Sequence, residues 1–380
     1  MEYDFDRIVD RSGTASMKWQ KYEKTDVLPM WVADMDFKTP PEIIQALKKR
    51  MSHEIFGYTL VPDKLSRIVA DRMKKLYGWH VEPEWIIWLP GVVSGLNMAC
   101  RAFGKKIVTT TPIYPPFLSA PGNQNKEIIT VPMKNENQRD TFDFNGIETA
   151  FRQGGGLFLL CSPYNPGGTL FNREELERLV SLCEEYNVIL CSDEIHADFV
   201  LDPENSHIPT ASISSGAADR TITLMAPSKT YNIPGLCASF AIVSDPDIRE
   251  HFSKAGRGMM PAVNLLGLTA AQAAYEKCDE WLAQLITYLR SSRDLVVDRV
   301  NRMPGCSLNP IESTYLAWID VRDTGLPDPA AFFEQAGVGL SDGRYFGRKG
   351  FVRLNFGCPR SVLEEGLKRM ETALKTRVSD

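Results

Sequence analysis

The sequence lacks long hydrophobic runs and a strong excess of one charge. It contains no run of about 18 apolar residues, the length that a membrane-spanning helix needs, and the acidic start at residues 1–7 has no apolar signal-peptide core. Its 43 lysines and arginines are nearly balanced by 48 aspartates and glutamates, which disfavours a polyanionic partner. We therefore expect a cytoplasmic, soluble protein with no membrane or nucleic-acid partner.

Several cysteine and nucleotide-binding motifs are also missing. The eight cysteines show no C-x-x-C spacing, and several lie in apolar runs such as residues 157–161, where a thiol behaves as a small apolar side chain. We expect reduced core thiols, with neither a disulfide framework nor a metal site. The sequence has no G-x-G-x-x-G and no P-loop motif, which disfavours a Rossmann dehydrogenase or a P-loop enzyme.

Short apolar runs alternate with helical patterns over the middle of the chain. The runs that predict strands lie at residues 86–89, 107–109, 128–131, 157–161, 188–191, 221–225 and 240–243. Near-continuous apolar strands separated by helices indicate a mostly parallel sheet that is covered by helices on both faces. The expected fold class is α/β.

Helix signals before and after this region indicate further units. Helices are expected after Thr39 and after Pro62, the second ending at Gly78, and another after Asn172, which can cap it. A helical region from about 265 to 303, strand patterns at 314–319 and 351–356, and helices near 330–335 and 362–374 indicate a smaller α+β unit. We expect an N-terminal segment at 1–50 that packs with the small domain, a large domain at 51–280 and the small domain at 281–380.

Lys229 is the first candidate for chemistry, because it follows the strand pattern at 221–225 and ligands of open α/β sheets bind at the carboxyl ends of strands. Pro227 and Pro234 prevent a long regular element from running past it, which predicts a rigid turn. An amine that loses hydration there becomes nucleophilic and forms an imine with an aldehyde. A single lysine is more often an exposed side chain, so the assignment depends on neighbouring residues.

Asn165 and Asp193 also follow apolar strand patterns. Asn165 lies between prolines and glycines in SPYNPGGT at 162–169, which fixes its amide near a strand end; the alternative is a simple turn. Asp193 follows the run at 188–191, and a buried carboxylate needs a cationic partner such as a protonated pyridine nitrogen; the alternative is a helix cap. His196 follows Asp193 by three residues and is a further candidate for the site; the alternative is a hydrogen-bonded core imidazole.

Two other stretches predict anion binding. In PGVVSGLN at 90–97 a strand runs through a glycine turn into a helix, whose free backbone N–H groups would bind a phosphate, although any strand-to-helix turn can use glycine. In FVRLNF at 351–356, alternation places Arg353 and Asn355 on one face. Arg353 would hold a carboxylate through two parallel hydrogen bonds; the alternative is a solvated strand face.

Together these motifs resemble the pyridoxal-phosphate enzymes of the aspartate aminotransferase fold, and most closely their MalY/PatB-type branch, the cystathionine β-lyases or C–S lyases. The likeness extends over nearly the whole chain. It is carried by DRSGT at 10–14, MWVADMDF at 30–37, FGYT at 56–59, YPPF at 114–117, SDEIHAD at 192–198, PSKTYN at 227–232 and FVRLNF at 351–356. The resemblance implies a large domain with a mostly parallel sheet and a smaller α+β domain.

The resemblance also implies how pyridoxal 5′-phosphate is held. Lys229 would form the covalent link, and Asp193 would pair with the ring nitrogen. Asn165 would bind the ring 3-oxygen, and Tyr114 would stack on the ring. The remaining implied cofactor contacts are the backbone N–H groups of Val92 and Val93, together with Ser228, His196 and, from a neighbouring subunit, Tyr58.

The same resemblance implies a substrate site and a dimer. Arg353, Ala33 and Asn165 would bind the substrate. Lys229, Asp193 and Tyr58 would act in catalysis. Because Tyr58 would reach the cofactor of the neighbouring subunit, the resemblance implies a homodimer with shared active sites.

The chain departs from many aminotransferases at three of these positions. Ala226 stands in place of a serine and Cys237 in place of an arginine, so the phosphate loses a hydroxyl and a guanidinium. His196 replaces a tyrosine, which changes the contact to the ring oxygen. These departures favour the lyase branch over transamination.

The expected reaction is α,β-elimination from an amino acid with sulfur on Cβ, which yields a thiol, pyruvate and ammonia. Cystathionine would give homocysteine, and cysteine would give hydrogen sulfide. One alternative is an aminotransferase on the same scaffold. Another is a regulatory protein that binds a transcription factor through its surface.

Overall fold

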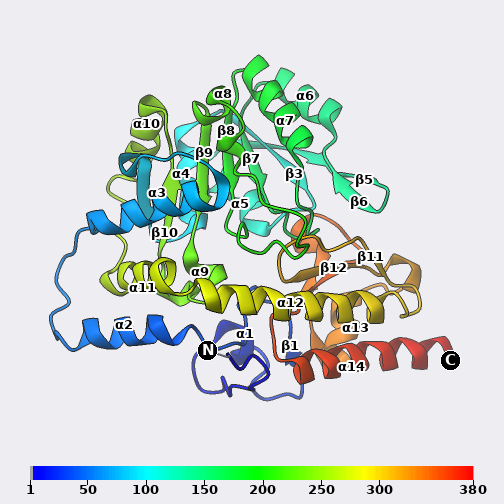
Figure 1. Cartoon of the computed structure of the whole chain (residues 1–380). Helices are drawn as coiled ribbons and strands as arrows, with labels where there is room; N and C mark the ends of the chain where they lie inside the picture. The colour runs from blue at the N-terminus through cyan, green and yellow to red at the C-terminus, as the bar shows by residue number, and fades with distance from the viewer. Residues whose placement is uncertain (1–2, 380) are drawn as a thin grey trace.

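A seven-stranded sheet forms the centre of the larger part of the molecule (Figure 1) in a computed structural model that describes residues 3–379. The strand order is β2-β10-β9-β8-β7-β3-β4. The strands are β2 Ile86–Leu89, β3 Lys106–Thr111, β4 Glu127–Pro132, β7 Gly155–Cys161, β8 Ile189–Asp193, β9 Thr221–Met225 and β10 Ser239–Ile242. Only β10 runs antiparallel to its neighbours in this sheet. The predicted mostly parallel sheet is confirmed.

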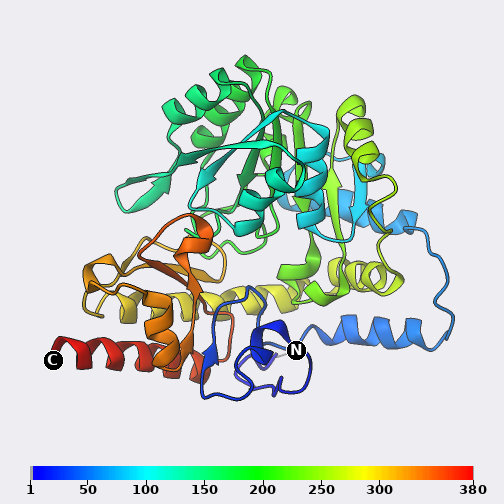
Figure 2. The same ribbon diagram turned by 180° about the vertical axis from the view of Figure 1, so that it is seen from behind.

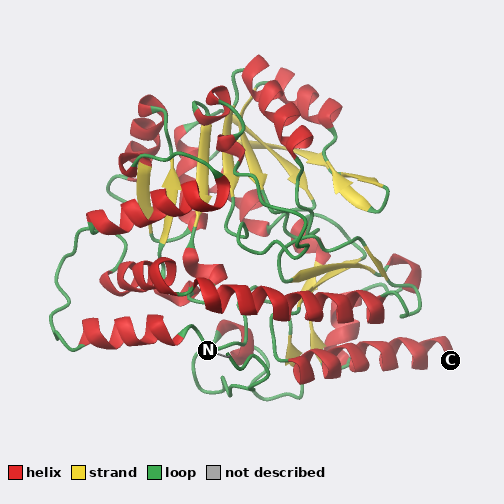
Figure 3. Ribbon diagram, in the orientation of Figure 1, coloured by secondary structure: helices red, strands yellow, loops and turns green. Residues whose placement is uncertain are grey.

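Helices lie on both faces of this sheet (Figures 1 and 3). They include α3 Asp63–Tyr77, α4 Val92–Ala102, α5 Pro115–Asn123, α6 Phe144–Arg152, α7 Arg173–Glu185, α8 Ser215–Ala218 and α10 Pro246–Gly256. The predicted cap of α7 is present, because the Asn172 side chain accepts a 2.9 Å hydrogen bond from the Glu175 N–H and the Glu175 carboxylate accepts one from the Asn172 N–H. Gly78 ends α3 in the left-handed conformation, with a φ of 64°.

A smaller antiparallel sheet lies in the C-terminal part of the chain, with the order β11-β12-β15-β14. Its strands are β11 Ser307–Leu308, β12 Leu316–Asp320, β14 Ser341–Asp342 and β15 Phe351–Asn355, and helices α12 Asp279–Val300, α13 Pro329–Gln335 and α14 Arg360–Ser379 accompany them (Figure 2). The N-terminal segment joins this part through β1 Leu28–Pro29, which pairs in parallel with β13 Val338–Gly339. The domain limits at residues 50 and 280 stay a prediction.

Some local features differ from expectation. The helical region at 265–303 is two helices, α11 Leu265–Lys277 and α12, because Cys278 has non-helical backbone angles and α12 starts anew with two acidic residues in its first turn. The hairpin formed by β5 Lys134–Glu136 and β6 Arg139–Thr141 was not predicted. Its residues are polar and show no apolar alternation, so the sequence gives no strand signal there.

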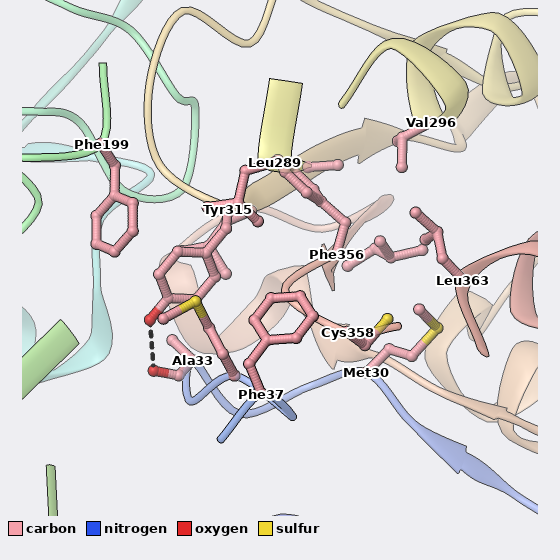
Figure 4. Close-up of a cluster of buried hydrophobic side chains, with 14 of the residues drawn as sticks. Met30, Ala33, Phe37, Phe199, Leu289, Val296, Tyr315, Phe356, Cys358 and Leu363 are labelled. Carbon is pink, nitrogen blue, oxygen red and sulfur yellow. Dashed lines mark hydrogen bonds between the residues drawn. The ribbon is translucent and has the colours of Figure 1, made fainter. Parts of the chain in front are cut away.

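Residues 30–37, which we call the anchor segment, pack against the C-terminal part of the chain. Met30 and Met35 are each 1% exposed, and Met30, Ala33 and Phe37 lie among core side chains that include Tyr315 and Phe356 (Figure 4). The segment has no regular secondary structure after β1. It continues into α2 Pro41–Met51, which begins directly after Pro40 as predicted.

Buried ion pairs fix this anchor from the N-terminal side. The Lys18 ammonium is 1% exposed and lies 2.6 Å from the Asp36 carboxylate, which also accepts a 2.7 Å hydrogen bond from Arg11. Arg11 in turn binds Asp34 at 2.8 Å. A buried charge is costly without a partner. The ion pairs of Lys18 and Arg11 with the two aspartates therefore favour one backbone conformation of residues 34–36.

No helix within residues 3–379 is long and apolar enough to cross a membrane. All eight cysteines carry free thiols. Six of them are buried, at positions 100, 161, 183, 191, 278 and 358. The part of the chain that the structure describes contains no group of three or more His, Cys, Asp and Glu side chains that could hold a metal ion.

Candidate active site

Three neighbouring strands of the large sheet bring the candidate residues to one edge. β7, β8 and β9 are parallel, with Cys161 opposite Asp193 and Asp193 opposite Leu224. The strands therefore end together, and Asn165, Asp193 and Lys229 follow at the same edge. This is the edge at which open α/β sheets bind ligands.

Lys229 lies in α9 Pro227–Thr230, a single helical turn that starts two residues after β9. Its amine donates a 2.6 Å hydrogen bond to the carbonyl oxygen of Ala33. Burial lowers the pKa of Lys229 to about 8, because desolvation disfavours the charged form. At pH 7 about a tenth of the amine is therefore neutral and nucleophilic. The alternative of an exposed lysine is wrong.

Asp193 ends β8 and is 3% exposed. Its carboxylate accepts a 3.1 Å hydrogen bond from the Ile195 N–H, and no cationic side chain within residues 3–379 forms an ion pair with it. Burial raises the pKa of Asp193 to about 7, although the positive charge of Lys229 opposes this shift. The two side chains thus lie within electrostatic reach of each other. A cation placed beside Asp193 would complete a buried pair.

Arg353 lies at the centre of β15, between Trp318 of β12 and Ser341 of β14. It is 4% exposed, so the alternative of a solvated strand face is wrong. One terminal nitrogen donates to the Trp31 carbonyl oxygen at 3.0 Å, while Nε is buried without a partner. Burial lowers the pKa of Arg353 to about 10, which leaves the guanidinium charged at neutral pH. An unpaired donor on a buried cation is a site for an anionic ligand group.

Asn165 contacts Arg353 directly. Its side-chain oxygen accepts a 2.9 Å hydrogen bond from the other terminal nitrogen of Arg353. Because a guanidinium only donates, this contact fixes the amide orientation and leaves the NH₂ group of Asn165 as the donor toward a ligand. The Asn165 side chain is only 4% exposed, whereas residues that serve only a turn usually lie at the surface.

Ala33, Tyr114, Lys229 and Arg353 line one cavity of about 720 Å³. Ala33 belongs to the N-terminal segment and Tyr114 precedes α5. Lys229 lies in α9, which follows β9 of the large sheet, and Arg353 lies in β15 of the small sheet. Residues distant in the sequence therefore face the same space. The volume is typical of small-molecule sites.

Side chains hold the backbone of the wall that contains Ala33. Tyr315 donates to the Ala33 carbonyl oxygen at 2.9 Å (Figure 4), and Asn355 donates to the carbonyl oxygens of Val32 and Asp34 at 2.6 and 2.7 Å. The functional role of Tyr315 was missed, because a contact to a distant backbone carbonyl leaves no sequence pattern. One sequence feature pointed to Asn355, because the alternation in residues 351–356 places it on the same strand face as Arg353.

Asn232 holds the far end of this wall. Its side chain donates to the carbonyl oxygens of Met35 and Phe37, each at 2.8 Å, and accepts from the Met35 N–H at 3.0 Å. Asn232 follows Lys229 by three residues and has a φ of 55°, a conformation that asparagine tolerates. Asn232 therefore links the turn that carries Lys229 to the segment whose Ala33 carbonyl accepts the hydrogen bond of the lysine.

The amino end of α4 offers backbone donors at the same edge of the sheet. The first N–H groups that bond within this helix belong to Ser94 and Gly95, which donate to the Gly91 carbonyl oxygen at 3.1 and 3.3 Å. The N–H groups of Val92 and Val93 precede them and have no acceptor within the helix. A Cβ at Gly91 would meet no atom within 4 Å, so there is open space in front of this terminus. The geometry suits a phosphate.

His196 lies three residues after Asp193 and is 2% exposed. Its Nδ1 is buried without a partner, so the alternative of a fully hydrogen-bonded core imidazole does not describe this atom. Burial lowers the pKa of His196 to about 3, and the charges of Lys229 and Arg353 act in the same direction. The ring is therefore neutral and close to both basic residues.

The other predicted positions lie around these residues. Ser228 is partly buried beside Lys229 in α9, and Ala226 is 5% exposed just before this helix. Cys237 is exposed with a φ of 51°. Tyr58 is fully exposed in the connection between α2 and α3, which stands out from the body at the left of Figure 1. The structure does not bring Tyr58 to the cavity of its own chain.

A second layer of contacts ties Lys229 to the segment that follows Asp193. The hydroxyl of Thr230 donates to Asp198 at 2.8 Å. The other oxygen of Asp198 accepts a 2.8 Å hydrogen bond from Arg72 of α3, whose guanidinium is 8% exposed. This network was not predicted, because its members come from three separate stretches of sequence.

These residues fit pyridoxal 5′-phosphate. The aldehyde requires an amine such as Lys229, and the pyridine nitrogen requires a buried acid without a cation, which Asp193 provides. The open amino end of α4 suits the phosphate. The NH₂ group of Asn165 and the unpaired Nδ1 of His196 would be available to an oxygen substituent of the ring. The unpaired Nε of Arg353 then suits the carboxylate of an amino acid.

Comparisons with known proteins agree with this geometry. The aminotransferase class I and II family matches residues 25–370. Cystathionine beta-lyase PatB of Bacillus subtilis is 39% identical, over 98% of this chain and 100% of that protein. The solved structure of OvoB has a TM-score of 0.96 at 44% identity, covering 98% of this chain and 100% of that one.

The structure of cystalysin from Treponema denticola, which contains pyridoxal 5′-phosphate, has a TM-score of 0.94 at 34% identity and covers 99% of this chain and 100% of that one. The matched region includes both sheets and the residues of the cavity from Ala33 to Arg353. The resemblance inferred from the sequence is thereby confirmed, and the chain belongs to the class I and II aminotransferase family, in the branch that contains PatB.

Proposed function

We propose that this protein is a pyridoxal-phosphate-dependent carbon–sulfur lyase of the cystathionine β-lyase type. The observation that carries the proposal is that one sheet edge holds a buried acid without a cationic partner, Asp193, and a partly buried amine of lowered pKa, Lys229. The name of PatB and the pyridoxal phosphate in the cystalysin structure support it. The products are a thiol, pyruvate and ammonia.

The candidate residues have distinct roles in the proposed reaction. The bound cofactor supplies an electron-withdrawing ring that stabilises negative charge on the substrate Cα. Asp193 keeps a proton at the pyridine nitrogen through an ion pair. Lys229 Nζ takes the proton from Cα, because its lowered pKa makes the neutral amine available. The Cβ–S bond then breaks, and the sulfur leaves with its bonding electron pair as a thiolate, which takes the proton held by Lys229 Nζ and becomes the thiol. Water hydrolyses the remaining unsaturated amino acid to pyruvate and ammonia.

Arg353 and Asn165 orient the amino-acid substrate. The free Nε and an adjacent nitrogen of Arg353 would bind the two oxygens of its carboxylate. The carbonyl oxygen of Ala33 accepts a hydrogen bond from Lys229 Nζ. It would therefore hold the lysine amine when the amine is not bound to the cofactor.

We also propose a cytoplasmic homodimer. The connection between α2 and α3 exposes Ile55, Phe56, Tyr58 and Leu60, each more than half exposed. Exposed apolar side chains gathered on a protruding segment are typical of a subunit contact. Tyr58 would then reach the phosphate at the amino end of α4 in the partner. Free thiols are maintained in the reducing cytoplasm.

One assay tests the reaction. Purified protein with pyridoxal 5′-phosphate is mixed with L-cystathionine, and separately with an amino acid and a keto acid. We expect pyruvate and homocysteine from the first mixture and no amino transfer in the second. Lys229→Ala should lose the activity, while Lys368→Ala, at an exposed position outside the cavity, should keep it. Amino transfer without pyruvate release would contradict the proposal.

A further inference from the structure

A second cavity lies between the hairpin of β5 and β6 and the small sheet; we call it the rear cavity. Its volume is about 600 Å³, which suits a small molecule. Asn135, Gln138 and Asp140 of the hairpin line it, and so do Trp318 of β12 and Phe351 of β15. In Figures 1 and 2 the hairpin lies on the opposite side of the molecule from the connection between α2 and α3. The proposed subunit contact through that connection therefore lies away from the rear cavity.

Asp140 is a buried acid without a cationic partner. The residue is 4% exposed, and its Oδ2 is buried without a hydrogen bond. The other oxygen accepts only a long hydrogen bond from Asn135, at 3.5 Å. Burial raises the pKa of Asp140, although the Asn135 contact and the charge of Arg348 oppose this shift. An unpaired buried carboxyl group is a site for the ammonium of a ligand.

Arg348 is a cation without an anionic partner. Its guanidinium lies 4.7 Å from the centre of the Phe351 ring and forms no hydrogen bond or ion pair with any side chain within residues 3–379. The other arginine of the cavity, Arg322, is already paired, because its Nε donates to the two oxygens of Asp320 at 2.9 and 3.1 Å. Among the charged residues that line the rear cavity, Asp140 and Arg348 thus remain for a ligand.

These two charges have opposite signs, which restricts the class of ligand. A simple cation would be attracted by Asp140 and repelled by Arg348, and a simple anion would meet the reverse. A zwitterion satisfies both residues at once. Leu308 and Trp318 line the same cavity and offer an apolar surface beside the charges. This combination matches an amino acid with an apolar side chain.

The rear cavity shares a wall with the active-site cavity. Trp318 and Phe351, which line the rear cavity, pack with Phe346 in one aromatic cluster, and Phe346 lines the active-site cavity. The ring of Phe346 lies 4.7 Å from the guanidinium carbon of Arg353, and Trp318 lies opposite Arg353 in the ladder of β12 and β15. One layer of aromatic rings therefore separates the rear cavity from the residue that would bind the substrate carboxylate.

The two unpaired charges also lie on the chain segments that lead to Asn165 and Arg353. A Cβ at Gly167 would lie 2.5 Å from Asp140 Oδ2, so Asp140 packs against the chain two residues after Asn165. Arg348 precedes Arg353 by five residues. The 2.9 Å hydrogen bond between Arg353 and Asn165 joins the same two segments. A ligand that bridges Asp140 and Arg348 would therefore favour the arrangement in which Asn165 and Arg353 are paired.

We propose that the rear cavity is a regulatory site that binds a free amino acid with an apolar side chain. Asp140 binds the ammonium of this ligand, Arg348 binds its carboxylate through two parallel hydrogen bonds, and its side chain packs against Leu308 and Trp318. The bound ligand lowers the KM of the active site, because it holds Arg353 in position for the substrate. The site goes beyond the proposed lyase function, which enters only as one of the two readouts.

Calorimetric titration of the pyridoxal-phosphate-loaded protein tests the ligand class. The probe is N,N-dimethyl-L-phenylalanine, whose tertiary amine cannot form an imine with the cofactor. Three analogues each lack one feature: N,N-dimethyl-2-phenylethylamine lacks the carboxylate, 3-phenylpropanoate lacks the ammonium, and N,N-dimethylglycine lacks the apolar side chain. We expect each analogue to bind about tenfold or more weakly than the probe, because each leaves one group of the cavity unpaired or uncovered.

Variants locate the bound probe. Asp140→Asn and Arg348→Gln should each weaken its binding by about tenfold or more. Arg353→Lys is the matched control for the other cavity and should change the affinity by less than about threefold. If Arg353→Lys weakens binding as much as Arg348→Gln does, the probe occupies the active site and the inference is overturned.

Steady-state kinetics with L-cystathionine tests the regulatory effect. A saturating concentration of N,N-dimethyl-L-phenylalanine should lower KM by about fivefold and leave kcat within about twofold, and Arg348→Gln should abolish this response. A probe that competes with substrate at the active site would raise KM instead.

The outcomes separate the regulatory site from the proposed function. No calorimetric binding, equal affinity for all four probes, or a KM that is unchanged or raised would overturn the regulatory site while the lyase function stands. Failure to release pyruvate from L-cystathionine would instead overturn the lyase function, and calorimetry would still decide whether the rear cavity binds an amino acid.

Discussion

The amine of Lys229 donates a 2.6 Å hydrogen bond to the carbonyl oxygen of Ala33, which lies 196 positions earlier in the chain. The hydroxyl of Tyr315 binds the same oxygen at 2.9 Å. The reactive lysine is thus positioned by an irregular N-terminal segment as well as by its own strand. The direction in which the amine points depends on this contact.

Cofactor uptake should depend on pH through Lys229. Only the neutral amine attacks an aldehyde, and burial lowers the pKa of Lys229 to about 8. The rate at which cofactor-free protein binds pyridoxal 5′-phosphate covalently should rise about tenfold per pH unit below that pKa and level off above it. Stopped-flow absorbance measures the rate. A rate that does not vary between about pH 6 and 8 would contradict the assignment.

Asp193→Asn should stabilise the cofactor-free protein at neutral pH and remove most of its activity. The folded-state pKa of Asp193 is raised to about 7 from 3.8, so the folded state keeps a proton that the unfolded chain loses. Wild-type stability therefore falls as the pH rises through this window. At pH 8 the variant should be more stable by up to about 4 kcal/mol.

Urea unfolding of the two cofactor-free proteins at about pH 4 and pH 8 checks this difference. The two should converge at the lower pH, since the carboxylate is then protonated in the folded state. An equal gap at both pH values would assign the effect to packing instead. Turnover of the loaded variant should fall severely, because the amide does not pair with a protonated ring nitrogen.

Arg353→Lys should weaken substrate binding more than it slows turnover. Lysine keeps the charge but loses the planar fork and the contact to Asn165. We expect KM for L-cystathionine to rise by about ten- to a hundredfold, or about 1.4 to 2.8 kcal/mol. Steady-state kinetics measures the change. Arg302→Lys, at a position that is 71% exposed, is the matched control and should leave KM unchanged.

Thr230→Val should loosen the turn that carries Lys229. The variant removes the 2.8 Å hydrogen bond to Asp198 and leaves that carboxylate with Arg72 alone. The loss of a buried hydrogen bond costs about 1 to 3 kcal/mol in the free energy of unfolding. Thr230→Ser keeps the hydroxyl and should restore both stability and kcat. If the serine variant behaves like the valine variant, packing of the methyl group is the cause.

Mixed dimers should test the proposed role of Tyr58. Tyr58→Ala and Lys229→Ala should each be inactive alone, since each would damage both sites of a dimer. Unfolding and refolding the two together gives hybrids with one intact site, which should recover up to about a quarter of wild-type activity. A mixture that stays inactive, although sedimentation shows dimers, would contradict a site shared between subunits.

The fold could be predicted largely because its signals are local. The strand patterns at 86–89 and 221–225 match β2 and β9 residue for residue. Gly78 and Asn172 mark helix boundaries through their own backbone and side-chain chemistry. The polar hairpin at 134–141 was missed, since pairing without an apolar face leaves no periodicity.

The candidate site was predicted from strand ends, from the alternation that places Arg353 on one face of its strand, and from the family resemblance. Asp193 and Lys229 could be found because parallel strands place their carboxyl ends together. Tyr315, Asn232 and Asp198 could not, because each acts on a group far away in sequence or in an unrelated loop. Their partners are set by tertiary packing, which no local pattern records.

The way in which the wall at residues 31–37 is held determines which positions around the site tolerate substitution. The contacts that hold it reach main-chain oxygens and nitrogens of Trp31, Val32, Ala33, Asp34, Met35 and Phe37. Replacing Val32 or Ala33 by another small residue leaves those atoms in place. Substitution should be tolerated less at the side chains that hydrogen-bond to these atoms, namely Asn232, Tyr315 and Asn355. At positions 32 and 33 the shape of the wall is therefore set less by the segment's own side chains than by the distant side chains that bind its backbone.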